Sequence, residues 1–87
     1  MKEIQITITH PVGLHARPAA RFVQTAKKFA SDVNVSYCDK TKSAKSILGI
    51  LSMGVNANAQ ITIQANGADE EEAIKALVEL IESNFGE

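Results

Sequence analysis

The hydrophobic pattern of this chain changes period several times, and these changes constrain its fold more than any other feature. Apolar and polar residues alternate in three short segments, as is typical of half-buried strands: Ile4 to Ile8, Val33 to Tyr37 and Ile61 to Ala65. A further short strand is expected near Thr41 to Ser43, after a tight turn at Asp39 and Lys40. The other apolar segments have helical spacing, which predicts the order β-α-β-β-α-β-α.

The first two predicted helices have recognisable ends. The first spans Ala16 to Ala30, with Pro18 in the first turn, where a missing N–H breaks no helical hydrogen bond. Lys27 and Lys28 lie near its end, where positive charge suits the helix dipole. The second helix is shorter and apolar. It follows Ser46 as the predicted N-cap, begins at Ile47, continues to about Met53 and ends at Gly54.

The third predicted helix closes the pattern. Asp69 with Glu72 resembles a capping box at its start, and three glutamates in a row lie at the positive end of its dipole. Its predicted buried face consists of Ala73, Ile74, Leu77, Val78 and Ile81.

These elements predict the fold class. A chain of 87 residues fits one domain, spanning 1–87. Because each strand alternates instead of being apolar throughout, the sheet is expected to be antiparallel, with one covered face. We therefore predict an α+β fold, a two-layer open-faced sandwich of a four-stranded antiparallel sheet with three helices on one face.

Composition excludes several classes of protein. No apolar segment precedes the first strand, which predicts that there is no signal peptide. No apolar run approaches the roughly 18 residues that a membrane-spanning helix needs, so no membrane association is expected. The single cysteine, Cys38, has no partner for an internal disulfide. A reducing cytoplasm is the predicted location.

Charge is unevenly distributed along the chain. Residues 1–45 hold eight Lys or Arg against three acids, whereas residues 46–87 hold one Lys against seven acids. This split indicates either two solvated faces of opposite sign or a basic face that meets acidic partners or phosphate. A nucleic-acid binder is disfavoured, because the net charge is −1 and the strands offer no exposed aromatic side chains for base stacking.

One segment carries candidate chemistry, the run Gly13-Leu14-His15-Ala16-Arg17-Pro18 at the start of the first predicted helix. A helix N-terminus binds anions through its free N–H groups, here those of Ala16 and Arg17. The Arg17 guanidinium adds a permanent charge that can bind two phosphate oxygens. Both features should keep the imidazole of His15 neutral, and a neutral imidazole is a nucleophile.

The simpler interpretation is that His15 is a capping residue beside a surface arginine. No acid or serine adjoins it to complete a hydrolytic triad. His10 is the only other histidine and Cys38 lies far along the chain, so no metal or cofactor is expected.

Two separated signatures and a similar terminal helix decide between these interpretations. The segment from Gly13 to Ala20 resembles the active-site signature of the HPr family, the histidine-containing phosphocarriers of the bacterial sugar phosphotransferase system. Lys45 to Gly54 is similar to the family's second signature, and Gly67 to Ile81 to its terminal helix. The resemblance covers essentially the whole chain.

The resemblance implies a function. His15 would accept a phosphoryl group on Nδ1 from enzyme I, which phosphoenolpyruvate charges, and would donate it to IIA components of sugar permeases. Arg17 would contact the phosphate. Such a protein is a carrier, not an enzyme, and is expected to be a monomer. Val12 departs from the family, whose members often have a small polar residue there.

Ser46 has two interpretations. It is a predicted helix cap, and it also matches the serine that a dedicated kinase/phosphorylase modifies in many HPr proteins, whose modified form binds a catabolite-repression transcription regulator. An alternative function is therefore an HPr-like regulatory protein that acts mainly through Ser46. Regulators of that kind lack the active-site histidine, whereas His15 is present here.

The second helix is apolar nearly all round. Ile47, Leu48 and Leu51 fall on one side, and Ile50 and Met53 on others. The helix is either covered as part of the core or leaves a patch that docks partners, with Ala20 of the first helix nearby. Basic residues around such a patch would attract acidic partners: Arg21, Lys27 and Lys45.

Overall fold

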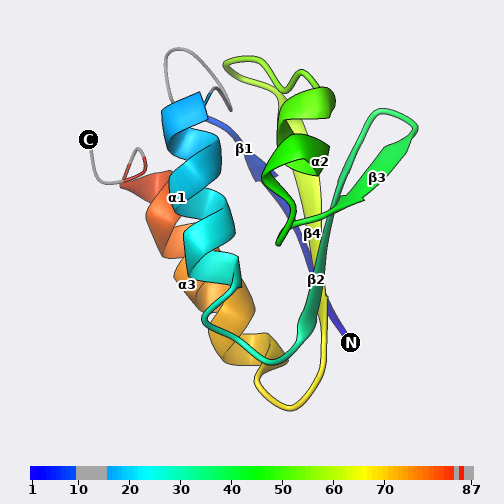
Figure 1. The fold of residues 1–87 in the computed structure, drawn as a ribbon, viewed down its shortest axis with the longest axis vertical. Helices are drawn as coiled ribbons and strands as arrows, with labels where there is room; N and C mark the ends of the chain where they lie inside the picture. The colour runs from blue at the N-terminus through cyan, green and yellow to red at the C-terminus, as the bar shows by residue number, and fades with distance from the viewer. Residues whose placement is uncertain (10–15, 84, 86–87) are drawn as a thin grey trace.

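The computed structural model describes residues 1–9, 16–83 and 85. Its elements are β1 (Lys2–Thr7), α1 (Ala16–Ala26), β2 (Asp32–Tyr37), β3 (Lys40–Ser43), α2 (Ile47–Ser52), β4 (Gln60–Asn66) and α3 (Glu70–Glu82). Their order along the chain is the predicted one (Figure 1).

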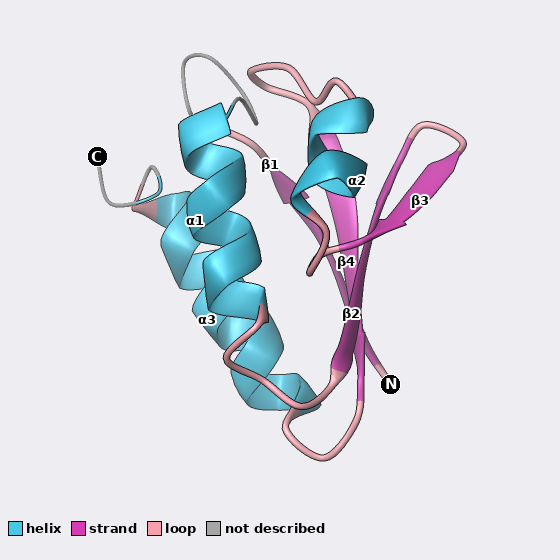
Figure 2. Cartoon of the chain, viewed as in Figure 1, coloured by secondary structure: helices cyan, strands magenta, loops and turns pink. Residues whose placement is uncertain are grey.

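The four strands form one sheet in the order β1-β4-β2-β3. Each neighbouring pair of strands is antiparallel, so β4 lies inside the sheet while β1 and β3 are its edges. The three helices cover one face, and the other face is left open (Figure 2). The predicted α+β open-faced sandwich is therefore confirmed.

The core fills the space between the sheet and the helices. Its large, fully buried side chains include Phe22 of α1, Ile50 of α2, Ile61 and Ile63 of β4, and Leu77 of α3. The predicted face of the third helix is confirmed at its centre, where Ala73, Leu77 and Ile81 are buried. Ile74 and Val78 are only half-buried, because they lie toward the β1 edge of the sheet.

The first helix is shorter than the sequence predicts. It ends at Ala26 instead of Ala30, and the chain then tightens, with Lys28 and Phe29 donating to carbonyls only three residues back. Lys27 and Lys28 therefore lie beyond the helix instead of in its last turn.

Asp69 explains this early end. Its carboxylate accepts the backbone N–H of Ala30 and that of Ser31, each at 2.9 Å, and also the Ser31 hydroxyl. The N–H groups of Ala30 and Ser31, which a longer helix would bond to its own carbonyls, thus donate to a side chain 39 and 38 residues away instead. The predicted capping box is wrong for the same reason, because the Asp69 side chain makes no capping hydrogen bond to α3. Instead, Glu70 accepts the N–H of Gly67 at 3.2 Å.

Gly67, in the turn before α3, lies against Ser31 in the turn after α1, and we call this contact the turn junction. A Cβ at this position would lie 2.6 Å from the Ser31 hydroxyl oxygen and 2.7 Å from the Ser31 Cα. Only glycine permits so close an approach of the two backbones. The turn after α1 and the turn before α3 are therefore packed directly together.

This junction predicts an acid-sensitive contribution to stability. Donation from Ser31 and Ala30 lowers the pKa of Asp69 below its usual value. A carboxyl with a lower pKa in the folded state contributes stability above its unfolded pKa of about 3.9. That contribution disappears as the pH falls through the folded value.

We expect Asp69→Asn to lower Tm by several degrees at pH 7, because the paired donors lose an ionised acceptor. The difference in Tm between wild type and variant should shrink below about pH 4. Thermal unfolding followed by circular dichroism measures both effects. Asp39→Asn in the exposed β2–β3 hairpin is the control. An Asp69→Asn difference that stays constant down to pH 2.5 would contradict the assignment.

Candidate functional site

The described part of the candidate site is the start of α1. The helix begins at Ala16, so its first turn follows His15 directly in the chain. His15 itself, with Val12 and Gly13, lies outside the described residues. The role assigned to His15 therefore stays a prediction.

The first turn of α1 has the properties of an anion-binding end. It contains no acidic residue, and the N–H groups at the start of an α-helix have no acceptor within the helix. Ala16 and Arg17 are exposed, whereas Pro18 and Ala19 are buried and seat the helix against the core. Pro18 lies in the first turn, as predicted. An exposed guanidinium and N–H groups at one helix end suit a phosphoryl group.

The second candidate position is the start of α2. Ser46 is its N-cap, as the sequence predicts, and its hydroxyl oxygen accepts the N–H of Gly49 at 3.1 Å. The Ser46 side chain is exposed. Ser46 therefore caps the helix and is also open to solvent.

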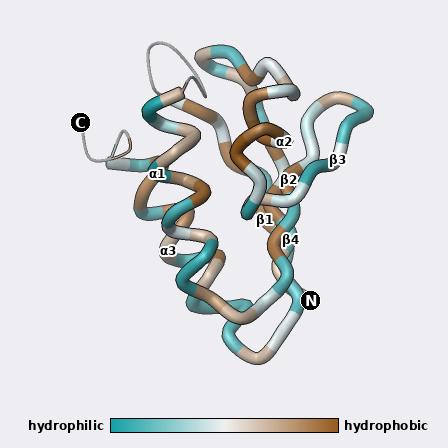
Figure 3. Tube along the Cα trace, in the orientation of Figure 1, coloured by the Kyte–Doolittle hydropathy of each residue, from teal (hydrophilic) through white to brown (hydrophobic). Residues whose placement is uncertain are grey.

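The apolar residues of α2 and of its C-cap, Met53, divide into two groups. Ile50 is fully buried and Met53 is 3% exposed, so these residues hold the helix on the sheet. Ile47, Leu48 and Leu51 are 40%, 77% and 37% exposed. We call these three residues the α2 patch. Met1 is the one other large apolar side chain exposed within the described ranges, and the apolar character of α2 is visible in Figure 3.

The residues predicted to surround the α2 patch are only partly placed as expected. α1 packs beside α2, and Ala20 of α1 is half-buried. Arg21 and Lys27 are exposed, as steering charges would need to be. Lys45 differs, because it is half-buried and its ammonium donates to the carbonyl of Phe29 at 2.8 Å. Lys45 thus ties the turn after α1 to the segment before α2.

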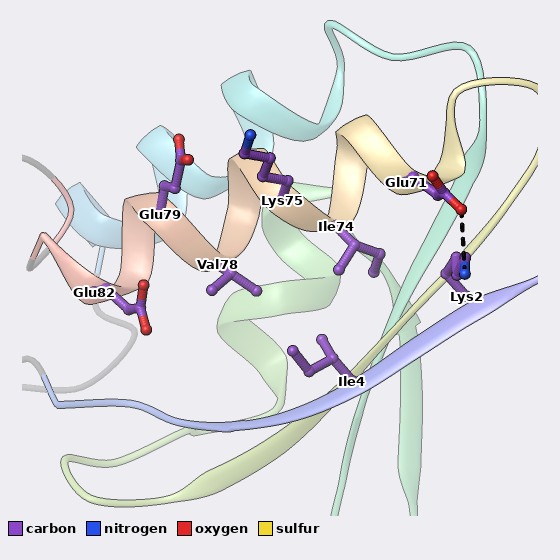
Figure 4. Close-up of a pocket in the computed structure, with 8 residues that line it drawn as sticks. All are labelled: Lys2, Ile4, Glu71, Ile74, Lys75, Val78, Glu79 and Glu82. Carbon is purple, nitrogen blue, oxygen red and sulfur yellow. Dashed lines mark ion pairs between the residues drawn. The ribbon is translucent and has the colours of Figure 1, made fainter.

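A groove that the sequence does not predict lies elsewhere, between β1 and α3 (Figure 4). It encloses about 470 Å³ over Ile4, Ile74 and Val78, and an ion pair of 3.2 Å between Lys2 and Glu71 stands at one end. Its lining contains no histidine, cysteine, serine or threonine. Its polar lining consists of lysine and glutamate side chains only.

The described residues contain neither a cluster of metal-ligating side chains nor a membrane-spanning helix. In residues 1–9, 16–83 and 85, no three His, Cys, Asp or Glu side chains are placed to hold a metal ion. None of the helices in those ranges is long and apolar enough to cross a membrane.

Comparison with known proteins places the chain among phosphocarriers. Residues 2–83 match the family model described as the PTS HPr component phosphorylation site. The crystal structure of HPr-C-His from Thermoanaerobacter tengcongensis is 59% identical, covers 100% of this chain and 98% of its own, and superposes with a TM-score of 0.97.

Two more distant structures have the same fold. Phosphocarrier protein HPr from Bacillus anthracis is 40% identical over 92% of this chain and 95% of its own, with a TM-score of 0.89. Crh, a catabolite-repression protein of Bacillus subtilis that forms an intertwined, swapped dimer, is 38% identical over 95% of each chain, with a TM-score of 0.76.

Proposed function

Because the chain belongs to the HPr family, the phosphocarriers of the phosphotransferase system, we propose that it takes a phosphoryl group from enzyme I on Nδ1 of His15 and passes it to IIA components of sugar permeases. The observation that supports this role best is the start of α1 at Ala16, directly after His15, with Arg17 exposed in the first turn. The proposed location is the cytoplasm, where the phosphoryl donor and acceptors would be met.

The proposed reaction is a transfer between two proteins. The lone pair of neutral Nδ1 attacks phosphorus, the bond from phosphorus to enzyme I breaks, and its electron pair stays with enzyme I. The N–H groups of Ala16 and Arg17 and the Arg17 guanidinium would hold the phosphoryl oxygens. The second transfer runs the same way, with His15 as the leaving group. This mechanism needs no metal or cofactor from the carrier.

The test uses purified components. Incubation with phosphoenolpyruvate and enzyme I should give one adduct that is labile in acid and stable in base, as phosphohistidine is. Adding a IIA protein should then remove the label from the carrier. If no adduct forms with active enzyme I, the carrier function fails.

A second candidate function is a regulatory binding protein that acts mainly through Ser46. Its support is the similarity to Crh, together with the exposed Ser46 hydroxyl. Partners would be a serine kinase/phosphorylase and a catabolite-repression transcription regulator. An adduct on His15 that reaches IIA proteins would favour the carrier, whereas modification of Ser46 alone would favour the regulator.

We propose the α2 patch as the docking surface for enzyme I and IIA proteins. Burying an exposed Ile or Leu side chain contributes about 1–3 kcal/mol to binding. Leu48→Asp should therefore raise the KM for this protein in the enzyme I reaction by about tenfold or more, one factor of ten being about 1.4 kcal/mol. Tm should change little, because a side chain that is 77% exposed leaves no cavity.

Steady-state kinetics and thermal unfolding together test this docking surface. Ala68→Asp adds the same charge at an exposed position in the turn between β4 and α3, so it controls for charge alone. An equal KM increase in both variants would show that the α2 patch makes no specific contact. A large loss of Tm in Leu48→Asp would mean that Leu48 supports the fold instead.

We also propose that phosphate on Ser46 slows phosphorylation of His15. The modification would add about two negative charges beside the α2 patch, and a partner covering Leu48 would have to desolvate them. A phosphate at a helix N-cap is locally favourable, so the fold should persist. The initial rate of His15 phosphorylation by enzyme I should be lower by about tenfold or more for the full chain carrying phosphoserine at position 46 than for the unmodified chain. Equal rates at low salt would remove this proposal.

A further inference from the structure

Two lysines lie close to Ser46 in the sequence, and the structure distinguishes them. Lys45 precedes Ser46 directly, but its ammonium already donates to the Phe29 carbonyl at 2.8 Å. Lys42 lies on β3 and is exposed. Neither of the two ion pairs found in the described residues involves Lys42. Its charge is therefore available to a new anion, whereas that of Lys45 has a structural partner.

Strand pairing sets the direction of the Lys42 side chain. Lys42 is the residue opposite Val35 in the β2–β3 pair, and Val35 is fully buried beneath the helices. Directly opposite residues of an antiparallel pair project from the same face of the sheet. Lys42 therefore projects from the face that carries α2 and not from the open face.

Gly49 gives an independent indication that the side chains of Lys42 and Ser46 lie close together. A Cβ built on Gly49 would lie 3.2 Å from the Ser46 hydroxyl oxygen and 3.3 Å from the Lys42 Cβ. Both atoms thus border the same small space, which exists because residue 49 has no side chain. From that point the flexible four-carbon stem of lysine lets the ammonium reach an anion on the Ser46 oxygen.

We infer that Lys42 is the internal counter-ion for a phosphate carried on Ser46. This inference rests on the proposed modification of Ser46 and adds how the chain itself receives the new charge. The phosphate brings a charge of about −1.5 to −2 and three strong acceptor oxygens, and the ammonium brings three donors. A partner that recognises the phosphate would have to displace Lys42 or bind beside it.

The test uses the full chain carrying phosphoserine at position 46, made by genetic incorporation, so that it needs neither a kinase nor enzyme I. Phosphorus NMR during a pH titration reports how tightly the phosphate holds its last proton. An ammonium in contact favours the fully ionised phosphate. We expect Lys42→Gln to raise the proton affinity of the phosphate about threefold, the equivalent of roughly 0.65 kcal/mol.

Lys40→Gln is the matched control. Lys40 lies two residues earlier on β3, so it projects from the same face about 7 Å farther along the strand. Its replacement should change the proton affinity much less, and Lys45→Gln tests the other nearby cation. An equal effect of Lys40→Gln, a larger effect of Lys45→Gln, or no effect of Lys42→Gln would each overturn the inference. Circular dichroism confirms that each variant is folded.

These results are separable from those of the carrier function. Phosphorylation of His15 is measured on the unmodified chain with enzyme I, and the phosphate titration is measured without any partner. If His15 is not phosphorylated, the inference about Lys42 is unaffected. If Lys42→Gln does not change the phosphate titration, the carrier function is unaffected.

Discussion

Replacing His15 with alanine is expected to abolish phosphorylation by phosphoenolpyruvate and enzyme I. The imidazole is the proposed nucleophile, and alanine has no atom that can form a bond to phosphorus. Acid-labile label should fall to background in a filter or gel assay, while the wild-type chain is labelled to about one phosphate per molecule. The fold should persist, because the buried core of the described residues consists of Ile8 and of apolar side chains from Ala19 onward.

His10→Ala is the matched control for this result, since His10 is the only other histidine in the chain. It should be labelled like wild type. Acid-labile label on His15→Ala, or its loss in His10→Ala alone, would show that the phosphoryl acceptor is a different residue. Circular dichroism of both variants excludes unfolding as the cause.

Reversing the charge of Arg17 is expected to slow phosphorylation by about tenfold to a hundredfold. Arg17 is exposed in the first turn of α1, where its charge would meet the incoming phosphoryl oxygens. Losing a hydrogen bond to a charged group costs about 1.5–3 kcal/mol, and glutamate adds repulsion to that loss. Rapid-quench measurements of the Arg17→Glu variant with phosphorylated enzyme I give this rate directly.

Lys28→Glu is the control for charge alone, because Lys28 is exposed beyond the other end of α1. Its rate should stay within about twofold of wild type at physiological salt, where screening acts over about 8 Å. Equal slowing by both variants would show that Arg17 acts only through the net charge of the protein.

Local patterns in the sequence predicted most of the fold. The alternation of apolar residues predicted the strands, and spacing placed Ile50 and Leu48 on different sides of the second helix, of which the structure buries Ile50 and exposes Leu48. The cap at Ser46 was also predictable, because the hydroxyl and the N–H that it binds are three residues apart. Each of these features depends on neighbours in the chain.

The errors have a different origin. The early end of α1 and the missing capping box both follow from Asp69 binding Ala30 and Ser31, which are 39 and 38 residues away. The contact of Lys45 with Phe29 also joins separate elements. A pattern of single residues carries no signal for such pairs. At the candidate site, the sequence predicts the nucleophile, and the structure adds the exposure of Arg17, Ser46 and the α2 patch.

The position of β4 in the sheet has a consequence for how the chain folds. β4 pairs with both β1 and β2, although it is the last strand to be synthesised. Among the strands of the described residues, only the β2–β3 hairpin joins two that are adjacent in sequence. Closing the loop from β1 to β4 costs chain entropy before any contact repays it, so folding is expected to be slower than for a helical domain of this size. During synthesis, β1, α1, the β2–β3 hairpin and α2 are all made before residues 60–66, so the complete sheet is expected to form only after β4 has been added.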